Sequence, residues 1–297
     1  MESDPFAPGP FSVGTRSGHA IDRERDSRQL PFEVWHPQGS TRRHPLVLYS
    51  HASGGHRRQS SFFCAHLASH GYVVAAADHI GNTAADFAER ARRNAAGETL
   101  TADESAARLH QIIADRVPDV RFLLDEMLSR ADTAALVDHE RIGLVGWSFG
   151  GWAVLSALEV DKRVRAVVAL APAGNSKPLP GIIPATLTFA WKREVPALFL
   201  VAERDRFTPL PGQYELFQRT PSSKRMFILH HADHQHFADE IPEPGLCSAE
   251  HAHLFTRSLG LSHFDAVLKG SRAAQEFMQD HPAAALQLRG VSCSEHL

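Results

Sequence analysis

Gly-Leu-Val-Gly-Trp-Ser-Phe-Gly-Gly, residues 143–151, is the most informative stretch of this chain. The apolar run 142–145 predicts a buried strand, and residues 152–158 predict a helix. Between them, residues 146–150 match the pattern G-x-S-x-G, which holds a serine on a sharp turn from a strand into a helix. The hydroxyl of Ser148 is therefore predicted to project from the top of a parallel sheet.

Glycines and a helix start surround this serine. Strained backbone at such a turn needs small neighbours, and Gly146, Gly150 and Gly151 supply them. The free N–H groups and the positive dipole end of the helix point at the same place and favour a developing oxyanion. The stretch therefore predicts a serine hydrolase, and the alternative is a glycine-rich turn with an incidental serine.

The composition is typical of an enzyme with a large core. The 297 residues suffice for one undivided α/β domain, and the net charge of -3 gives no electrostatic argument for nucleic acid or an anionic membrane. Three widely spaced cysteines predict neither a disulfide framework nor a zinc site. Residues 1–16 lack the apolar core of a secretory signal, and no run reaches transmembrane length, so a cytoplasmic location is expected.

Apolar runs alternate with helical patterns along most of the chain. Strands are predicted at residues 30–36, 46–50, 72–77, 142–145, 164–170, 196–201 and 226–229, and helices at 59–70, 117–130 and 152–158. The repeated strand–helix order predicts a doubly wound, mostly parallel sheet in a single α/β domain that covers residues 1–297.

Three segments depart from this order. Residues 81–115 are polar and alanine-rich, with helical stretches broken at Gly97, and residues 171–194 contain several prolines. Both follow the carboxyl ends of predicted strands, where ligands bind in open α/β sheets. They are expected to be insertions that shape the mouth of a pocket, whereas residues 282–297 are expected to be a loose tail.

A nucleophilic serine needs an acid and a base, which in this arrangement follow it in the order Ser, Asp/Glu, His. Asp205 lies in a polar loop just past the predicted strand 196–201. Glu203 is the nearest rival but lies closer to the strand. Asp205 is therefore predicted to be the acid, and an ordinary loop aspartate is the alternative.

Four histidines, at positions 230, 231, 234 and 236, follow the last predicted strand. His230 and His231 nearly continue that strand, whereas His234 and His236 lie on a loop that can reach over the sheet. Position alone leaves both of these open as the base. A zinc site is a further alternative, but no matching cysteine or carboxylate pattern accompanies the histidines, so no metal is predicted.

Two backbone N–H groups are expected to form an oxyanion hole. Phe149, directly after the serine, supplies one of them. The loop after the predicted strand 46–50 supplies the other, with Ser53 as the first choice and Ala52 as the second. His51 is expected to brace this loop by hydrogen bonding rather than to transfer protons.

Several further motifs share a family pattern. They are Pro-Phe-Glu-Val-Trp-His-Pro at 31–37, Tyr-Ser-His at 49–51, residues 67–79, residues 116–122, the serine turn, and Ala-Asp-His-Gln-His-Phe-Ala-Asp at 232–239. Together they resemble the α/β-hydrolases of the platelet-activating-factor acetylhydrolase and dienelactone-hydrolase-like esterase group, over roughly residues 11–239. The resemblance implies the α/β-hydrolase fold, His234 as the base of a His-x-x-Phe-x-Asp pattern, and Ser53 as the second oxyanion donor.

Two positions depart from that group. Ala52 stands where a glycine is expected after His51, which is expected to alter the oxyanion-hole backbone slightly. Ser148 stands where true dienelactone hydrolases use cysteine. Dienelactone is therefore not the expected substrate.

These residues predict two-step acyl transfer on a carboxylic ester without a cofactor. Ser148 attacks, His234 removes its proton, and Asp205 orients the imidazole. Aromatic residues near the expected site predict an apolar pocket for a small ester with a short acyl chain, and the alternative is that they only cover the core. They are Trp147, Phe87, Phe189, Trp191, Phe207 and Phe237.

Other functions are compatible with the same residues. Peptidase or thioesterase activity uses the same triad, and a non-catalytic binding protein on a hydrolase fold is the hypothesis from another class. The complete set of serine, acid and loop histidines favours the enzyme. Leu254, Phe255, Leu259, Leu261 and Phe264 suit either the core or the face of a homodimer.

Overall fold

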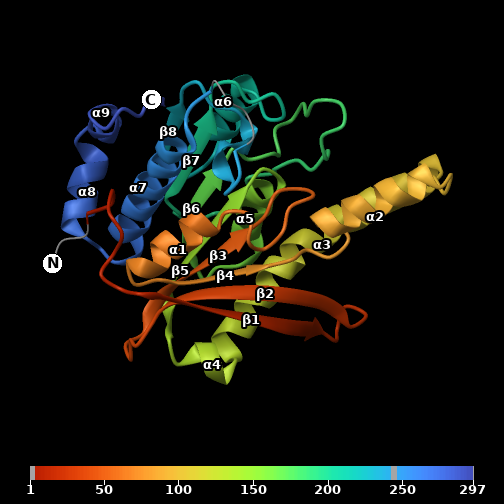
Figure 1. Cartoon of the computed structure of the whole chain (residues 1–297), viewed down its shortest axis with the longest axis horizontal. Coiled ribbons are helices and arrows are strands. Elements are labelled where there is room, and N and C mark those ends of the chain that lie inside the picture. The colour runs from red at the N-terminus through yellow and green to blue at the C-terminus, as the bar shows by residue number, and fades with distance from the viewer. Residues whose placement is uncertain (1–3, 242–245, 297) are drawn as a thin grey trace.

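A nine-stranded sheet runs through the computed structural model, which describes residues 4–241 and 246–296 (Figure 1). Its strands are β1 Val13–Asp22, β2 Arg28–Pro37, β3 His44–Ser50, β4 Val73–Ala77, β5 Val137–Trp147, β6 Val164–Leu170, β7 Ala197–Ala202, β8 Lys224–Leu229 and β9 Cys293–His296. They lie in the order β1-β2-β4-β3-β5-β6-β7-β8-β9. The strands from β4 to β8 in this order are parallel, and β1, β2 and β9 pair in antiparallel fashion.

Helices connect these strands and follow the last parallel one. They are α1 Ser61–Ser69, α2 Ala84–Ala95, α3 Ala102–Ser129, α4 Ala131–Ala134, α5 Phe149–Val160, α6 Leu210–Arg219, α7 Ala249–Leu268, α8 Arg272–Gln279 and α9 Pro282–Gln287, with a short 3-10 helix, η1, at His234–Phe237. Within the described residues, none of them is both long and apolar enough to cross a membrane.

The two faces of the sheet bury separate apolar cores. Side chains alternate between the faces along each strand, so Leu46 and Leu48 of β3 pack into one core and Val47 and Tyr49 into the other. Residues of α3, α5 and α6 complete the first core, and residues of α1 and α7 complete the second. The predicted doubly wound, mostly parallel α/β sheet is confirmed.

The apolar face of α7 belongs to this second core. Phe255, Leu259, Leu261 and Phe264 are fully buried within the chain, and Leu254 is partly buried against them. Of the two roles open for these residues, the structure assigns the core. A homodimer stays a prediction without this surface to support it.

The sequence pattern predicts seven strands of the sheet but not its outermost strands. β1 pairs with β2 along its whole length. Its sequence is largely polar and shows no clear apolar face, and it therefore predicts no strand there. Residues 282–296, expected as a loose tail, instead form α9 and β9, while Leu297 lies outside the described residues. β9 pairs with β8 from Met226 to Leu229 and supplies backbone partners to an edge that would otherwise be open.

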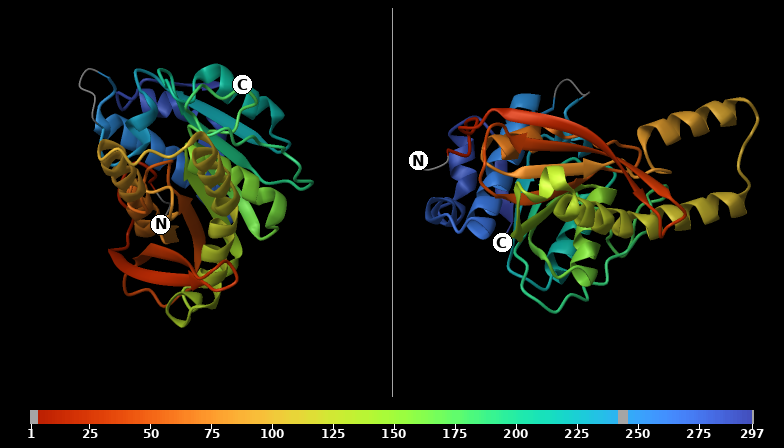
Figure 2. Two further views of the ribbon diagram at one scale, coloured as in Figure 1. Left: turned by 90° about the vertical axis from the view of Figure 1, so that its right-hand side faces the viewer. Right: turned by 90° about the horizontal axis from the view of Figure 1, so that it is seen from below.

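Most of the segment 81–115 lies in a helical hairpin that projects from the body of the molecule (Figure 2). α2 has no buried residue, and a capping box between Thr101 and Glu104 starts α3. α3 then continues through Pro118 for 28 residues, so the predicted helix start at 117 is wrong. The base of the hairpin reaches the sheet edge, where Asn82 and Phe87 contact the loop after β3. A role of this base in shaping the pocket stays a prediction, whereas the rest of the hairpin points away from the sheet.

The segment 171–194 also follows a different course from the expected one. The Trp152 indole of α5 donates to Thr186 O at 3.1 Å, and the N–H of Ala190 donates to Glu159 near the end of α5. The segment therefore runs down the outside of α5, away from the carboxyl ends of the strands. Its expected role at the pocket mouth is wrong for all but its first residues, because packing against α5 directs the chain.

Candidate active site

Ser148 forms the turn between β5 and α5 with φ 57° and ψ −117°. Such a positive φ costs a non-glycine residue about 1–3 kcal/mol, so the surrounding structure must hold it in place. The two glycines of the motif are sterically required. A Cβ on Gly146 would lie 2.2 Å from Gly150 O, and a Cβ on Gly150 would lie 2.0 Å from Ser50 O.

The N–H groups of Phe149 and Ser53 have no acceptor within the part of the chain that the structure describes. Phe149 is the first residue of α5, so its N–H points out of the helix end. In the loop after β3, the Ala52 N–H donates to Gln59 Oε1 at 3.2 Å, whereas the Ser53 N–H is free. This pairing favours Ser53 over Ala52 as an anion donor.

His51 is fully buried beneath the same loop. Its Nδ1 donates to Ala52 O at 2.6 Å, and its Nε2 accepts the N–H of His79 at 3.0 Å. Burial lowers the pKa of His51 well below its ordinary value, and the nearby Arg116 lowers it further. A neutral ring with both nitrogens engaged agrees with a bracing role for this residue.

Asp205 lies in the loop after β7 and is 5% exposed. Its Oδ1 accepts the N–H groups of Phe207 and Thr208 at 2.8 Å, and its Oδ2 accepts the Thr208 hydroxyl at 2.8 Å. Burial alone would raise the pKa of Asp205, but the bonds to His234 and Thr208 outweigh it and lower the pKa. The carboxylate is therefore ionised and fixed in direction.

His234 completes this pair. Its Nδ1 donates to Asp205 Oδ2 at 2.6 Å, and the ring lies 5.3 Å from the indole of Trp147 and 5.2 Å from the ring of Phe207, centroid to centroid. No described residue bonds its Nε2, which leaves that nitrogen open to a reacting group. Because Trp147 directly precedes Ser148, the imidazole lies beside the serine turn.

The rival acid and bases have other partners. Glu203 accepts the N–H of His231 at 2.9 Å and lies 3.5 Å from His230 Nδ1. His236 is fully buried, with its Nε2 donating to Cys247 O at 3.0 Å and its Nδ1 accepting the N–H of Asp233. Across residues 4–241 and 246–296, no three His, Cys, Asp or Glu side chains are grouped as metal ligands.

Three of the aromatic residues predicted to line a pocket lie beside this site. Trp147 contacts His234, although the indole itself is only 1% exposed. Phe87, at the base of the hairpin, packs its ring directly against Gly54 in the loop after β3. Phe207, 51% exposed, adds a third ring on the side of His234.

The remaining aromatic predictions are wrong. Phe237 is fully buried in the core under α1 and α7, so it has no surface for a ligand. The Trp191 indole donates to Ser222 Oγ, just before β8 begins, and Phe189 packs on Trp191. Both rings therefore lie at the amino edge of the sheet, because the segment 171–194 follows α5 to its far end.

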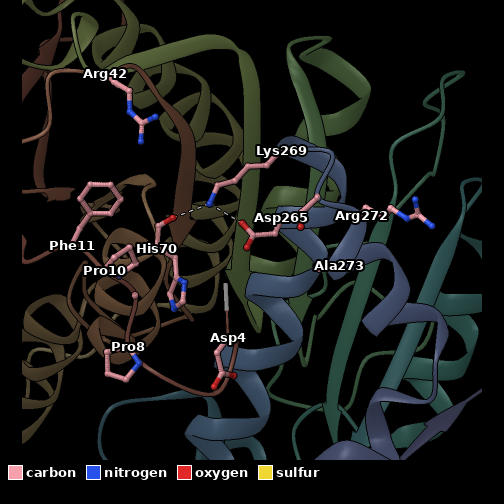
Figure 3. A pocket seen from close by; sticks show the side chains of 12 residues that line it. Asp4, Pro8, Pro10, Phe11, Arg42, His70, Asp265, Lys269, Arg272 and Ala273 are labelled. Atoms are coloured by element: carbon pink, nitrogen blue, oxygen red, sulfur yellow. Dashed lines mark hydrogen bonds and ion pairs between the residues drawn. The ribbon is translucent and has the colours of Figure 1, made fainter. Parts of the chain in front are cut away.

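A separate cleft of about 830 Å³ also lies at the amino edge (Figure 3). Residues 8–11, His70 directly after α1, the end of α7 and the start of α8 line it. Lys269 inside it donates to His70 O and to Asp265 Oδ1, both at 2.8 Å. None of the residues that line this cleft belongs to the serine site.

The sequence is similar to known proteins over most of its length. The model of the dienelactone hydrolase family matches residues 32–253, most of the chain. The chain is 24% identical over 271 residues to a platelet-activating factor acetylhydrolase of Canis lupus familiaris, covering 82% of this chain and 59% of the relative. It is 30% identical over 153 residues to a probable 1-alkyl-2-acetylglycerophosphocholine esterase of Arthroderma benhamiae, covering 51% of this chain and 33% of the relative.

The chain spans about half the length of the curated relatives it matches. Among solved structures, a ferulic acid esterase from Streptomyces cinnamoneus superposes with a TM-score of 0.68 at 22% identity. The superposition covers 89% of this chain and 93% of that one. This likeness extends the shared fold over almost the whole chain.

Proposed function

Since this chain belongs to the dienelactone hydrolase family, we propose that it is a serine hydrolase that cleaves carboxylic esters through an acyl-enzyme. One observation carries the proposal. The Asp205–His234 pair, bonded at 2.6 Å, lies against Trp147, the residue next to Ser148. A buried acid that fixes an imidazole with a free Nε2 beside a strained serine is the arrangement that activates a hydroxyl nucleophile.

In the proposed first step, His234 Nε2 takes the proton of Ser148 as Oγ attacks the ester carbonyl carbon. Asp205 stabilises the imidazolium that forms and keeps its tautomer. The carbonyl oxygen becomes an oxyanion that accepts the N–H groups of Phe149 and Ser53. Each such donor contributes a factor of about 10²–10³ to the rate, because it faces charge that exists only in the transition state.

In the second step the imidazolium gives its proton to the leaving alkoxide, and the alcohol departs. Water then loses a proton to His234 and attacks the acyl-enzyme carbonyl carbon. The same N–H groups stabilise the second oxyanion, which collapses to the free acid as the His234 imidazolium returns its proton to the departing Ser148 Oγ. The proposed cycle calls for no cofactor.

The substrate is proposed to be a small ester with a short acyl chain. The names of two relatives, a platelet-activating factor acetylhydrolase and a probable 1-alkyl-2-acetylglycerophosphocholine esterase, refer to acetyl esters, which have a short acyl chain. Phe87 and Phe207 border the site from two sides and supply apolar contacts. A cytoplasmic location is also proposed, supported by the three free cysteines.

The test is hydrolysis of p-nitrophenyl esters from acetate to octanoate by wild type and by Ser148→Ala, with Ser129→Ala as the matched surface control. Turnover that is lost only in Ser148→Ala supports the proposal, and the best chain length measures the acyl pocket. Mass spectrometry after fluorophosphonate treatment should place the adduct on Ser148. Turnover that survives in Ser148→Ala and disappears with a chelator would replace the serine mechanism with a metal-dependent one.

A further inference from the structure

Arg116 of α3 is a buried cation that the proposed catalytic steps do not use. Its side chain is among the largest fully buried ones in the described residues, at 1% exposure. Arginine is almost never buried completely without a partner, because its charge is costly to remove from water. The residues that receive its N–H groups therefore indicate what it does.

The first partner lies in the loop that carries Ser53. Arg116 Nη1 donates to His51 O at 2.6 Å and lies 3.5 Å from Ser50 Oγ. Ser50 ends β3, and His51 opens the loop that leads to Ser53 two residues later. The guanidinium thus holds the start of this loop by binding the carbonyl oxygen of His51, which lies just beyond the end of β3.

The second partner, Asn82, binds the same loop from its other side. Arg116 Nη2 donates to Asn82 Oδ1. Asn82 Nδ2 in turn donates to Ser53 Oγ at 2.9 Å, and Asn82 O accepts the Gly54 N–H at 3.1 Å. Two bonds from Asn82 therefore fix the direction in which the free Ser53 N–H points.

The third contact reaches the other half of the oxyanion hole. The guanidinium carbon of Arg116 lies 4.5 Å from the ring centroid of Phe149, and the same ring stacks on Trp152 at 4.9 Å. Cation–π contact of this kind is attractive and becomes stronger where water is excluded. One guanidinium therefore touches the segments that hold both free N–H groups.

The charge of Arg116 is not cancelled locally. In the described part of the chain no carboxylate forms an ion pair with it, and Asp119, one turn further along α3, is paired with Arg25 and Arg28 instead. Burial lowers the pKa of Arg116 to about 9, with a partial offset from Asp119, which leaves it protonated at neutral pH. A cation at low dielectric favours negative charge nearby.

We propose that Arg116 is a positioning residue of the oxyanion hole, which fixes the Ser53 and Phe149 N–H groups relative to each other and adds positive potential at the oxyanion. This role rests on the proposed ester hydrolysis at Ser148. It predicts that loss of the guanidinium weakens binding of the tetrahedral state more than binding of the substrate.

The experiment compares Arg116→Gln and Arg116→Lys with Arg193→Gln. Arg193 is a matched control at the amino edge, where it donates to Val164 O at 2.5 Å and Asp161 O at 2.8 Å. Like that of Arg116, its Nε is buried without a partner among the described residues. The readouts are kcat and KM for p-nitrophenyl acetate, the inhibition constant of phenylboronic acid, which forms a tetrahedral adduct with a serine, and the melting temperature.

Arg116→Gln should lower kcat by about 30- to 100-fold with KM within about three-fold, somewhat less than the loss of a direct oxyanion donor. Boronic acid affinity should fall in parallel. Arg116→Lys keeps the charge but not the planar fork and should recover about a third of that loss on a logarithmic scale. Arg193→Gln should change only the melting temperature.

Each alternative outcome is distinguishable. Wild type without turnover on any ester overturns the proposed function and this inference with it. Two results would overturn the inference alone, provided that the wild type turns over esters and Arg116→Gln folds. One is an unchanged kcat of Arg116→Gln, and the other is a lower kcat with unchanged boronic acid affinity. Should Arg116→Gln not fold, Asn82→Ala replaces it, and an Asn82→Ala enzyme with wild-type kcat and boronic acid affinity contradicts the positioning role.

Discussion

Two buried aspartates, one at each edge of the sheet, separate structural pairing from catalytic pairing. Asp205 is 5% exposed and Asp265 is 3% exposed, and each accepts a hydrogen bond from a basic side chain. Lys269, the partner of Asp265, donates another hydrogen bond to His70 O, so this pair is bonded to the protein on both sides. For His234, the partner of Asp205, no described residue bonds Nε2.

The two aspartates differ in what their basic partners contact, not in the carboxylates themselves. Burial and hydrogen bonding fix both aspartates equally well, so neither property identifies an active site by itself. At the carboxyl edge the pair ends in a nitrogen, beside a serine at φ 57° and two backbone N–H groups, and none of the three has a partner among the described residues. Unsatisfied groups of this kind are retained where a substrate completes them.

Neutralising the two aspartates should give the largest contrast in activity. Asp205→Asn is expected to lower kcat by about 10⁴-fold, since the amide favours the wrong imidazole tautomer. Asp265→Asn should leave kcat within about three-fold of wild type while lowering the free energy of unfolding by about 1–3 kcal/mol, because the half-buried Lys269 loses its counter-charge. Ester kinetics and urea unfolding of both variants measure the contrast.

A comparable loss of kcat in both variants would contradict the distinction between the two edges. It would mean that Asp265 acts on the site through the body of the sheet. The wild-type rate in Asp205→Asn would instead remove this carboxylate from the mechanism.

The serine turn should be the part of the carboxyl edge that is most sensitive to added volume. Gly150→Ala is expected to lower the free energy of unfolding by about 3 kcal/mol, because its Cβ would lie 2.0 Å from the backbone oxygen of Ser50. Gly151→Ala, whose Cβ would lie 2.8 Å from Pro172 Cβ, should cost less. Urea denaturation of both variants checks the order, and equal stabilities would show that the turn relaxes.

The serine turn could be predicted because all its determinants are consecutive. An apolar strand, G-x-S-x-G and a helix occur within one short stretch, and the steric demand on Gly146 and Gly150 is local. Asp205 and His234 required only the ends of two apolar runs, because parallel strands bring their carboxyl ends to one edge. Their contact is present, and their catalytic roles stay a proposal.

Other features depend on tertiary packing. His234 and His236 occupy one short turn and differ in the direction that their side chains face. The His236 ring is bonded to Asp233 and Cys247, whereas the His234 ring is bonded to Asp205. Arg116 lies in an amphipathic helix, where an arginine is expected to face water. The course of residues 171–194, and with it the position of Phe189, is set by contacts with α5 that no local pattern records.

Acid should reduce stability through buried histidines at both edges of the sheet. Burial lowers the pKa of His263 at the amino edge to about 4, although its bonds to Pro196 O and Val167 raise it, and burial together with Arg116 lowers the pKa of His79 at the carboxyl edge to about 4. The folded state then binds fewer protons than the unfolded state between about pH 6.5 and 4, so stability falls as the pH falls through this window.

His263→Gln should make the loss of unfolding free energy between pH 6.5 and pH 4 smaller by about 2 kcal/mol, because glutamine does not titrate. Glutamine can still donate a hydrogen bond to Pro196 O. Urea unfolding at intervals of pH measures it. The kcat at pH 7 should stay unchanged, since His263 lies at the amino edge. A slope equal to that of wild type would mean that His263 is protonated in the folded state.

The smallest contrast concerns two half-exposed apolar side chains at opposite edges. Phe207 is 51% exposed and lies 5.2 Å from the His234 ring, whereas Val160 is 52% exposed at the far end of α5. Phe207→Ala should raise KM for p-nitrophenyl butyrate by about three- to five-fold, the value of a partly buried apolar contact of about 1 kcal/mol, and change kcat less. Val160→Ala should change neither constant. Equal KM values in the two variants would place the acyl chain away from Phe207 and leave Phe87 as the aromatic wall of the site.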